Sequence, residues 1–305
     1  MRLVTRSDFD GLACAVLLKE MGLIDDYLFA HPKDLQDGLI SVSENDVLAN
    51  VPYVPGCGMW FDHHTSENAR LAEGVKFKGM SKPLRSCARV IWEYYEGEKS
   101  FSKSLLPMLE AVDKVDSANL TAQEIADPKG WIMLGFIMDP RTGLGRFKDF
   151  RISNYQLMLD MIDYCRSKKA EDILKIPDVS ERVDVYREQS RIFVDMLRRN
   201  SEVHGNLVVT DLRGEDTIYA GNRFLIYTLF LKCNISMQIM WGVRKQNVVI
   251  TLGHSILKRN CKTNVGKLML EYGGGGHDSV GTCQVPVEKA EEAIQALIKR
   301  ITAVG

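Results

Sequence analysis

Short apolar runs separated by turn residues dominate the first sixty or so residues of the chain. The runs have the length and the β-branched or aromatic character of buried strands, and they are Leu3 to Thr5, Tyr27 to Ala30, Val47 to Val51 and Gly58 to Phe61. Leu12 to Met21 has helical character and ends at Gly22, a residue that commonly follows a helix C-terminus. Strands that alternate with helical stretches favour a parallel sheet covered by helices.

The middle of the chain changes to helical spacing. Apolar residues recur at helical intervals from Ser86 to Val112, and Trp131 to Met138 is a dense apolar run. The stretch that follows, Asp139 to Arg146, has the composition of an exposed basic loop. After Pro177, apolar positions in a strongly charged background predict a long amphipathic helix, which is a natural connector between domains.

The C-terminal part of the chain returns to strand patterns. Strands are predicted at Leu207 to Thr210, Ser236 to Trp241, Val248 to Leu252 and Val280 to Val285, and helices at Phe224 to Leu231, Val265 to Glu271 and Val287 to Ile301. The predicted fold is therefore α/β. We expect an N-terminal parallel-sheet domain over residues 1–176, a connecting helix over 177–205 and a smaller C-terminal α/β domain over 206–305.

Composition excludes several classes of protein. The 305 residues carry a net charge of -1, so any phosphate-binding surface must be local rather than a global basic field. Seven cysteines without a Cys-x-x-Cys pair argue against a disulfide framework or a structural zinc site, and for a reducing compartment. No segment approaches the roughly 20 apolar residues of a membrane span, and the N-terminus lacks a signal-like apolar core. We expect a cytoplasmic protein with no membrane partner.

Two acidic motifs lie where predicted strands end. Asp62-His63-His64 directly follows an apolar run, and an acid with two imidazoles offers three potential metal ligands. Asp8 and Asp10 lie two residues apart between the first strand and the first helix, where carboxylates can converge on a hard cation. The alternatives are that the aspartates cap the helix or form the turn, and that the histidines are satisfied core residues.

A third motif is the run of four glycines from Gly273 to Gly276, followed by His277. Glycine is unfavourable inside a helix or strand, so we expect these amides to approach an anion, with His277 as a further donor. The alternative is a flexible loop after a helix. Nearby Lys258, Arg259 and Lys262 either add phosphate contacts or form a solvated face.

In order and spacing, Thr5 to Gly11, Phe61 to His64 and Tyr272 to His277 resemble the motifs of DHH phosphoesterases that carry a C-terminal DHH-associated domain. The resemblance spans nearly the whole chain and is strongest to the exopolyphosphatase-like and oligoribonuclease (nanoRNase) branch. It implies a cleft between two domains, in which the first domain holds one or two manganese ions and the second grips substrate.

The resemblance also implies roles for individual residues. Asp8, Asp10 and His63 would be metal ligands. A late carboxylate would join them, with Asp116 as the first choice and Asp113 as the second. Asp62, His63 and His64 would form the catalytic triplet, in which Asp62 and His64 orient groups or polarise substrate. The residues expected to bind phosphate are Arg6, Gly274, Gly275, Gly276, His277 and Arg259.

Two positions depart from the family pattern. Arg6 stands where many members have a histidine, and Asn50 stands where a strand usually ends in an aspartate that bridges two metals. Arginine is permanently charged and an amide is a weaker ligand than a carboxylate. We therefore expect one tightly bound divalent metal rather than two, with manganese as the expected ion.

The expected function is hydrolysis of a phosphodiester or phosphoanhydride bond by metal-activated water. Polyphosphate, a short single-stranded oligonucleotide and a small nucleotide are all open as substrates. Arg6 and Asn50 favour the alternative of a degenerate phosphoesterase that binds a phosphorylated ligand, or regulates through it, with little or no turnover. A homodimer also stays open.

Overall fold

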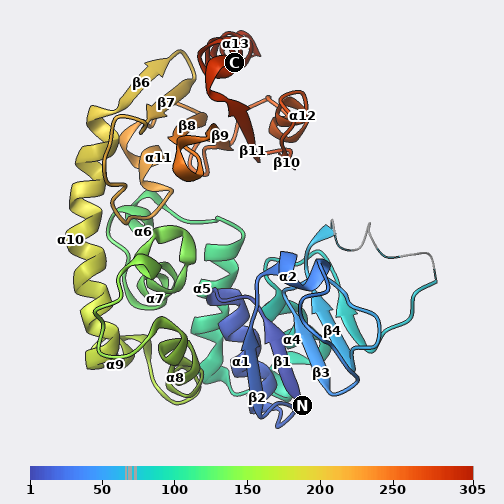
Figure 1. Cartoon of the computed structure of the whole chain (residues 1–305). Helices are drawn as coiled ribbons and strands as arrows, with labels where there is room; N and C mark the ends of the chain where they lie inside the picture. Colours follow the sequence, from blue (N-terminus) through green and yellow to red (C-terminus); the bar gives the residue numbers. More distant parts are fainter. Residues whose placement is uncertain (66, 68–70, 72–73, 305) are drawn as a thin grey trace. The chain divides into compact units, whose positions relative to one another are not determined.

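The structure is a computed structural model that describes residues 1–65, 67, 71 and 74–304. The chain divides into two compact units, each with its own sheet (Figure 1). The first unit comprises Met1–Asn119 and Pro128–Tyr186, and the second comprises Leu120–Asp127 and Arg187–Gly305. The division falls within α10 (Pro177–Arg199), the long helix predicted after Pro177. The α/β class expected from the sequence is confirmed.

The sheet of the first unit has five parallel strands in the order β2-β1-β3-β4-β5. Its strands are β1 (Arg2–Thr5), β2 (Asp26–Phe29), β3 (Asp46–Ala49), β4 (Met59–Asp62) and β5 (Gly79–Ser81). The sequence predicted the first four within a few residues. The short β5 lies at an edge and contains Gly79, and its three residues offered too little pattern to detect.

Alternate residues of these strands face opposite sides of the sheet, as the strand period requires. On one side Val4, Leu48 and Trp60 lie in register and pack with Leu35 of α2 (Pro32–Gln36). On the other side Phe61 meets Tyr94 of α4 edge to face, with ring centroids 5.2 Å apart. Both faces are therefore covered, as buried parallel sheets require.

The helices of the first unit follow the predicted apolar runs. They are α1 (Phe9–Glu20), α4 (Cys87–Tyr94), α5 (Leu106–Asp116), α7 (Gly130–Met138), α8 (Asn154–Ser167) and α9 (Ala170–Ile173), with short 3-10 helices η1 (Gly97–Lys99) and η2 (Lys103–Leu105). The expected exposed loop at 139–146 is wrong in part. It forms the 3-10 helices η3 (Pro140–Thr142) and η4 (Leu144–Arg146), and Asp139, Thr142 and Leu144 are buried.

The second unit holds a six-stranded mixed sheet in the order β10-β11-β9-β8-β7-β6. Its strands are β6 (Ser201–His204), β7 (Leu207–Asp211), β8 (Ile235–Trp241), β9 (Asn247–His254), β10 (Gly275–His277) and β11 (Val280–Pro286). Its helices are α6 (Ala122–Ala126), α11 (Leu225–Leu229), α12 (Val265–Leu270) and α13 (Ala290–Val304), with 3-10 helices η5 (Val243–Lys245) and η6 (Val287–Lys289). Strands β7 and β8 pair in parallel, and the other neighbouring pairs of this sheet are antiparallel.

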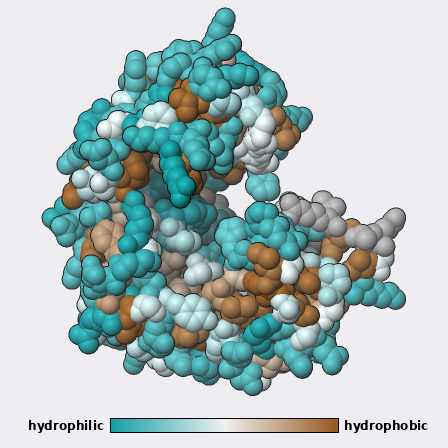
Figure 2. Space-filling view, viewed as in Figure 1, coloured by the Kyte–Doolittle hydropathy of each residue, from teal (hydrophilic) through white to brown (hydrophobic). Residues whose placement is uncertain are grey.

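One core lies between this second sheet and its helices. Ile235, Met237 and Ile239 alternate along β8 and are buried together with Leu297 of α13 and Met269 of α12. On the face drawn in Figure 2, hydrophilic residues predominate and hydrophobic ones lie in separate groups. None of the helices in the described residues is long and apolar enough to span a bilayer.

Asp46 and Asn50 lie at opposite ends of β3. Asp46 supports the edge of the first sheet at which its strands begin. It begins β3, is 3% exposed, and accepts hydrogen bonds from Arg2 Nε and Ser43 N, each at 2.7 Å. Burial raises the pKa of Asp46, but these bonds outweigh burial and hold the pKa below its usual value. The carboxylate therefore stabilises the fold in its charged form.

Substituting Asp46→Asn should lower the free energy of unfolding by about 2 kcal/mol at neutral pH, because charge-assisted bonds are lost. A carboxylate whose pKa is depressed in the folded state stabilises the fold at pH values above its unfolded-state pKa. This stabilisation is lost as the carboxylate protonates. The difference between wild type and variant should therefore shrink as the pH falls below about 4. Urea unfolding at several pH values measures it, and a difference that stays constant as the pH falls to about 2 would contradict this role.

Candidate functional site

Asp8 and Asp10 lie where β1 passes into α1. The Asp8 side chain caps the helix, because its Oδ1 accepts a hydrogen bond from Gly11 N at 2.9 Å. The chain turns so closely here that a Cβ at Gly11 would lie 2.0 Å from Arg6 O. Asp10 follows in the first turn of the helix and is 2% exposed. Both carboxylates thus lie at the carboxyl edge of the parallel sheet, where such sheets bind ligands.

The first turn of α4 holds the buried carboxylate of Asp10. Cys87 N donates to Oδ2 and Ala88 N donates to Oδ1, each at 2.8 Å. These amides have no partner within the helix, and the helix dipole favours negative charge beside them. Burial nevertheless raises the pKa of Asp10 well above its ordinary value, and the charges of Asp116 and Asp8 add to the rise. The carboxylate is therefore fixed in place in surroundings that disfavour its charge.

His63 directly follows β4 and turns one ring nitrogen toward two acidic side chains. Its Nδ1 lies 3.3 Å from Leu84 O, and because a carbonyl only accepts, Nδ1 carries the hydrogen. Nε2 is buried without a hydrogen-bond partner among the described residues, 3.3 Å from Asp116 Oδ2 and 3.7 Å from Asp10 Oδ2. Burial lowers the pKa of His63 despite the nearby charge of Asp116. A neutral ring with a free Nε2 lone pair is the form that ligates metals.

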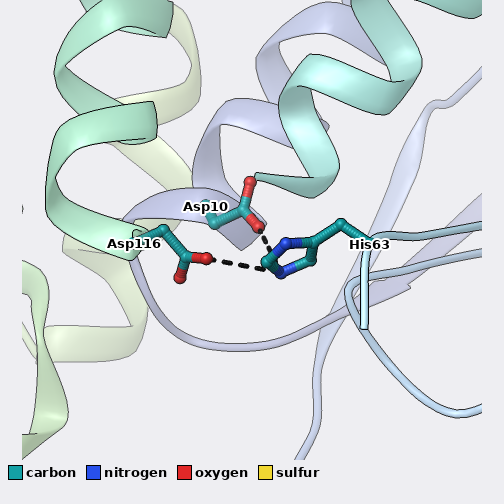
Figure 3. A group of neighbouring side chains, drawn as sticks. All are labelled: Asp10, His63 and Asp116. Atoms are coloured by element: carbon teal, nitrogen blue, oxygen red, sulfur yellow. Dashed lines mark ion pairs between the residues drawn. The ribbon is translucent and has the colours of Figure 1, made fainter. Parts of the chain in front are cut away.

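Asp10, His63 and Asp116 converge from three separate elements (Figure 3). Asp10 comes from α1, His63 follows β4, and Asp116 ends α5. One ligand atom from each lies within 4.8 Å of the others. One imidazole nitrogen and two carboxylate oxygens suit a divalent cation such as manganese or zinc. The donor set and the unpartnered Nε2 therefore fit a metal ion, and we call these three residues the metal group.

Asp8 lies outside the metal group and contacts protein donors instead. Besides the bond from Gly11, its Oδ1 is 3.3 Å from Asn50 Nδ2 and its Oδ2 is 3.2 Å from Arg6 Nε. Asn50 is 1% exposed and has a left-handed backbone with φ 57°, which asparagine tolerates better than most residues. A second cation at Asp8 would have to compete with this guanidinium and this amide.

The two candidates for the late carboxylate have different surroundings. Asp116 contacts His63, whereas Asp113, one turn earlier on α5, accepts hydrogen bonds from Ser86 Oγ at 2.7 Å and from Arg89 Nε at 2.9 Å and Nη2 at 2.7 Å. Ser86 is the N-cap of α4, the helix that holds Asp10. Asp113 therefore fastens α4 to α5, and Asp116 is the one that joins the metal group.

Asp62 and His64 form a pair beside the metal group. Asp62 is fully buried, and its Oδ1 accepts a hydrogen bond from His64 Nδ1 at 2.8 Å. Burial lowers the pKa of His64, but the bond to Asp62 and the charges of Asp62 and Asp116 outweigh burial and raise it overall. The rings of His63 and His64 lie 4.2 Å apart between centroids. The surroundings thus favour the neutral form of one imidazole and the charged form of its neighbour.

Two charged residues beside the metal group were missed by sequence reasoning. A small pocket is lined by Asp8, Phe9, Asp10, Val112, Val115, Asp116, Gly135, Asp139 and Arg141. Asp139 is 6% exposed, and its Oδ1 accepts hydrogen bonds from both N and Nε of Arg141, each at 2.8 Å. Burial lowers the pKa of Arg141, but Asp139 and the charges of Asp8 and Asp116 raise it overall. The available signal was an Asp-Pro-Arg sequence directly after a wholly apolar helix.

In the second unit, part of the glycine run lies in regular structure. Gly275–His277 form the short edge strand β10, which pairs antiparallel with β11 and was not among the predicted strands. The cause is close packing, since a Cβ at Gly274 would lie 2.2 Å from Thr282 O and 2.6 Å from Cys283 Cβ. Gly275 has no such neighbour within 4 Å, and His277 is exposed.

The basic segment before α12 is anchored to the end of β10. Arg259 is exposed, and its Nε donates to Ile256 O at 3.0 Å. Asn264, the N-cap of α12, donates from Nδ2 to Asp278 Oδ1 at 2.7 Å, next to His277. Arg259 and His277 therefore belong to adjoining segments of the second unit.

No family model and no curated protein matches the chain. Among solved structures, PggH, a pGpG-specific phosphodiesterase from Vibrio cholerae, is 50% identical, has a TM-score of 0.89, and matches over 100% of this chain and 99% of its own. A DHH domain from a protein assigned to a ribosomal protein family has a TM-score of 0.61 at 14% identity, over 99% of this chain and 86% of that one. The chain belongs to the DHH family of phosphoesterases.

A nuclease shares the fold of this DHH phosphoesterase more distantly. RecJ from Thermus thermophilus, in complex with Mg²⁺, has a TM-score of 0.50 at 13% identity, over 99% of this chain and 49% of its own. At that identity the likeness concerns the fold alone. The family resemblance carried by Asp8, Asp10, Asp62-His63-His64 and the glycine run is confirmed.

Asp113 and Asp116 should respond oppositely to loss of charge. Asp113→Asn leaves the Arg89 guanidinium without its carboxylate, so we expect the free energy of unfolding to fall by about 3 kcal/mol. Asp116→Asn relieves repulsion with Asp8 and Asp10, and the metal-free protein should be at least as stable as wild type. Denaturant unfolding with a chelator present measures both, and equal losses would show that the two carboxylates do not differ in role.

Gly274 and Gly275 provide a matched pair for the second unit. Gly274→Ala should destabilise by about 1–3 kcal/mol, because its Cβ has no room against β11. Gly275→Ala has open space around its Cβ and should melt close to wild type. Thermal unfolding of the two variants checks this, and a Gly274→Ala protein as stable as Gly275→Ala would refute the packing explanation.

Proposed function

We propose that this DHH phosphoesterase is a metal-dependent phosphodiesterase that hydrolyses a short linear dinucleotide such as pGpG. The observation that carries the proposal is the 50% identity to a pGpG-specific phosphodiesterase over essentially the full length of both chains. The metal group supports the same class of reaction, because divalent cations held by carboxylates and imidazoles commonly serve phosphodiester hydrolysis. This substrate falls within the small nucleotides expected from the sequence.

Asp10, His63 and Asp116 would hold one divalent cation, with manganese as the preferred ion. When bound, the cation lowers the pKa of a water molecule and offsets negative charge on the phosphoryl oxygens. Asp8 remains a candidate ligand, but it would have to release Arg6 or Asn50 in order to bind a metal. These contacts support one tightly bound cation rather than two.

His64 and Asp62 would act on the substrate rather than on the metal. Because Asp62 accepts from Nδ1, the nitrogen of His64 that remains to contact substrate is Nε2. A raised pKa favours a hydrogen on that nitrogen, which can then donate to a phosphoryl oxygen. His63, with its neutral ring, complements this role as a ligand.

The remaining phosphate contacts are assigned to Arg6 and to the second unit. The Arg6 side chain is 34% exposed, so it can bind Asp8 and a substrate phosphate from different edges. Gly275, His277 and Arg259 are the proposed contacts in the second unit, and Gly274 and Gly276 support them by their packing against β11. In functional terms we retain residues 1–176 as the catalytic domain, 177–205 as the connector and 206–305 as the substrate-binding domain.

The purified protein should convert pGpG to GMP when Mn²⁺ is supplied, and should act far more slowly on polyphosphate and longer RNA. Chromatographic separation of the products measures this. Asp10→Asn should abolish the reaction, since it removes the buried ligand that α4 holds. Asp37→Asn is the matched control, because Asp37 is an exposed aspartate paired with Lys33, and it should be as active as wild type. Elemental analysis should find one manganese per chain.

The alternative of a binding or regulatory protein predicts different results. Equal traces of product from wild type and Asp10→Asn, together with tight binding of pGpG, would support that alternative. Two manganese ions per chain would instead contradict the proposed effect of Arg6 and Asn50, without bearing on the reaction itself.

A further inference from the structure

Arg141 lies beside the metal group without being bonded to it. It lines the same small pocket as Asp8, Asp10 and Asp116. Its guanidinium bonds the carboxylate of Asp139, and the described residues include no ion pair from Arg141 to Asp8, Asp10 or Asp116. Its side chain is 49% exposed. Arg141 therefore pairs with Asp139, and no ion pair within the described residues joins it to the three other acids that line this pocket.

One edge of the guanidinium is fixed and the other edge is open. Asp139 accepts from Arg141 Nε at 2.8 Å through Oδ1 and at 3.1 Å through Oδ2, and its Oδ1 also accepts from the backbone N. Nη1 and Nη2 make no hydrogen bond to any residue in the described part of the chain. Because Asp139 is 6% exposed and caps η3, the brace is itself rigid.

Other arginines of the first unit are used differently. Arg89 engages Asp113 through both Nε and Nη2 and is a structural tie. Arg182 is 1% exposed and bonds backbone carbonyls through its terminal nitrogens. Arg141 is braced only through Nε, so its fork is left for an external partner.

The chemistry of that partner follows from the donors. Two parallel N–H groups of a guanidinium match two oxygens of a phosphate, and arginine binds such groups more specifically than lysine does. Bracing the side chain beforehand removes much of the entropy cost of ordering it on binding. A dicarboxylate or sulfate ligand would fit as well in geometry, but the phosphodiester is the anion that the proposed function brings to this pocket.

We propose that Arg141, braced by Asp139, contacts the nonbridging oxygens of the phosphate that undergoes hydrolysis. This inference rests on the proposed function and adds a substrate-binding residue to it. Charge on those oxygens is redistributed as the phosphodiester reacts, so a fixed donor beside them acts mainly on the reaction step. Asp139 is then a positioning residue, since it acts through Arg141.

The test compares Arg141→Gln, Arg141→Lys and Arg146→Gln in the manganese-loaded protein. Arg146 is the matched control, because it is an exposed arginine of the same segment that does not line the pocket. With pGpG, Arg141→Gln should lower kcat by about 100-fold and raise KM by no more than about tenfold, the factor expected for phosphate binding itself. Arg141→Lys should recover only part of this loss, because it keeps the charge and loses the fork. Arg146→Gln should match wild type.

A second readout does not depend on turnover. Titration calorimetry with inorganic phosphate should give an affinity about tenfold weaker for Arg141→Gln than for wild type and Arg146→Gln, with one bound manganese in all three. If wild type lacks activity but phosphate binding still depends on Arg141, the proposed function fails and the phosphate contact stands.

The proposal is overturned if kcat and phosphate affinity of Arg141→Gln equal those of Arg146→Gln, or if Arg141→Gln loses its manganese. Should Arg141→Gln fail to fold, Arg141→Lys decides the matter. Wild-type kcat and phosphate affinity in that variant would refute the bidentate contact, and a partial loss of both with an unchanged melting temperature would support it.

Discussion

The buried carboxylate of Asp10, held by two amides at the start of α4, is the contact on which the site of the first unit depends. Those amides are in reach because Ser86 ends the preceding loop and caps the helix. Ser86 is fixed in turn by Asp113 of α5. The chain of bonds therefore connects α1, α4 and α5, and it sets where the end of α5 lies. Asp116 reaches His63 as a result of this network rather than through any strong contact of its own.

Electrostatics explains why the network has to be so extensive. Burial raises the pKa of Asp10 and of Asp116, and the charge of Asp8 adds to the rise of both. The negative charge of Asp8 is offset by the guanidinium of Arg6 and the amide of Asn50. Asp10 and Asp116 have only the uncharged ring of His63 between them. The carboxylates of Asp10 and Asp116 would therefore be stabilised by a positive charge bound between them. That is the physical basis for proposing one cation in a family whose pattern can accommodate two.

The sequence was informative wherever local pattern decides the structure, and it failed where distant contacts decide. Strands β1, β3 and β4 were predictable because buried parallel strands are nearly continuous apolar runs. The edge strand β2 is less buried and was recognised by its aromatic and apolar residues. Asp113 and Asp116 could not be told apart, since they lie three residues apart on one helix. Their roles depend on Ser86, Arg89 and His63, which lie far away in the sequence. The edge strand β10 was missed because its glycines are required by close packing against the backbone of β11. Local propensity does not describe a contact of that kind.

The segment after α7 shows the same limit at a functional level. Polar residues and glycines in sequence are typical of an exposed loop, yet Asp139, Thr142 and Leu144 are buried. Because Asp139 is buried, its carboxylate is held in place and fixes one edge of the Arg141 guanidinium. The Nε edge of Arg141 bonds Asp139, a buried residue of the first unit. The Nη edge can therefore bind a ligand without breaking that bond. The carboxylates nearby stabilise the charge of Arg141, but they leave its Nη edge without a hydrogen-bond partner among the described residues. A phosphate bound at the metal group would supply that partner.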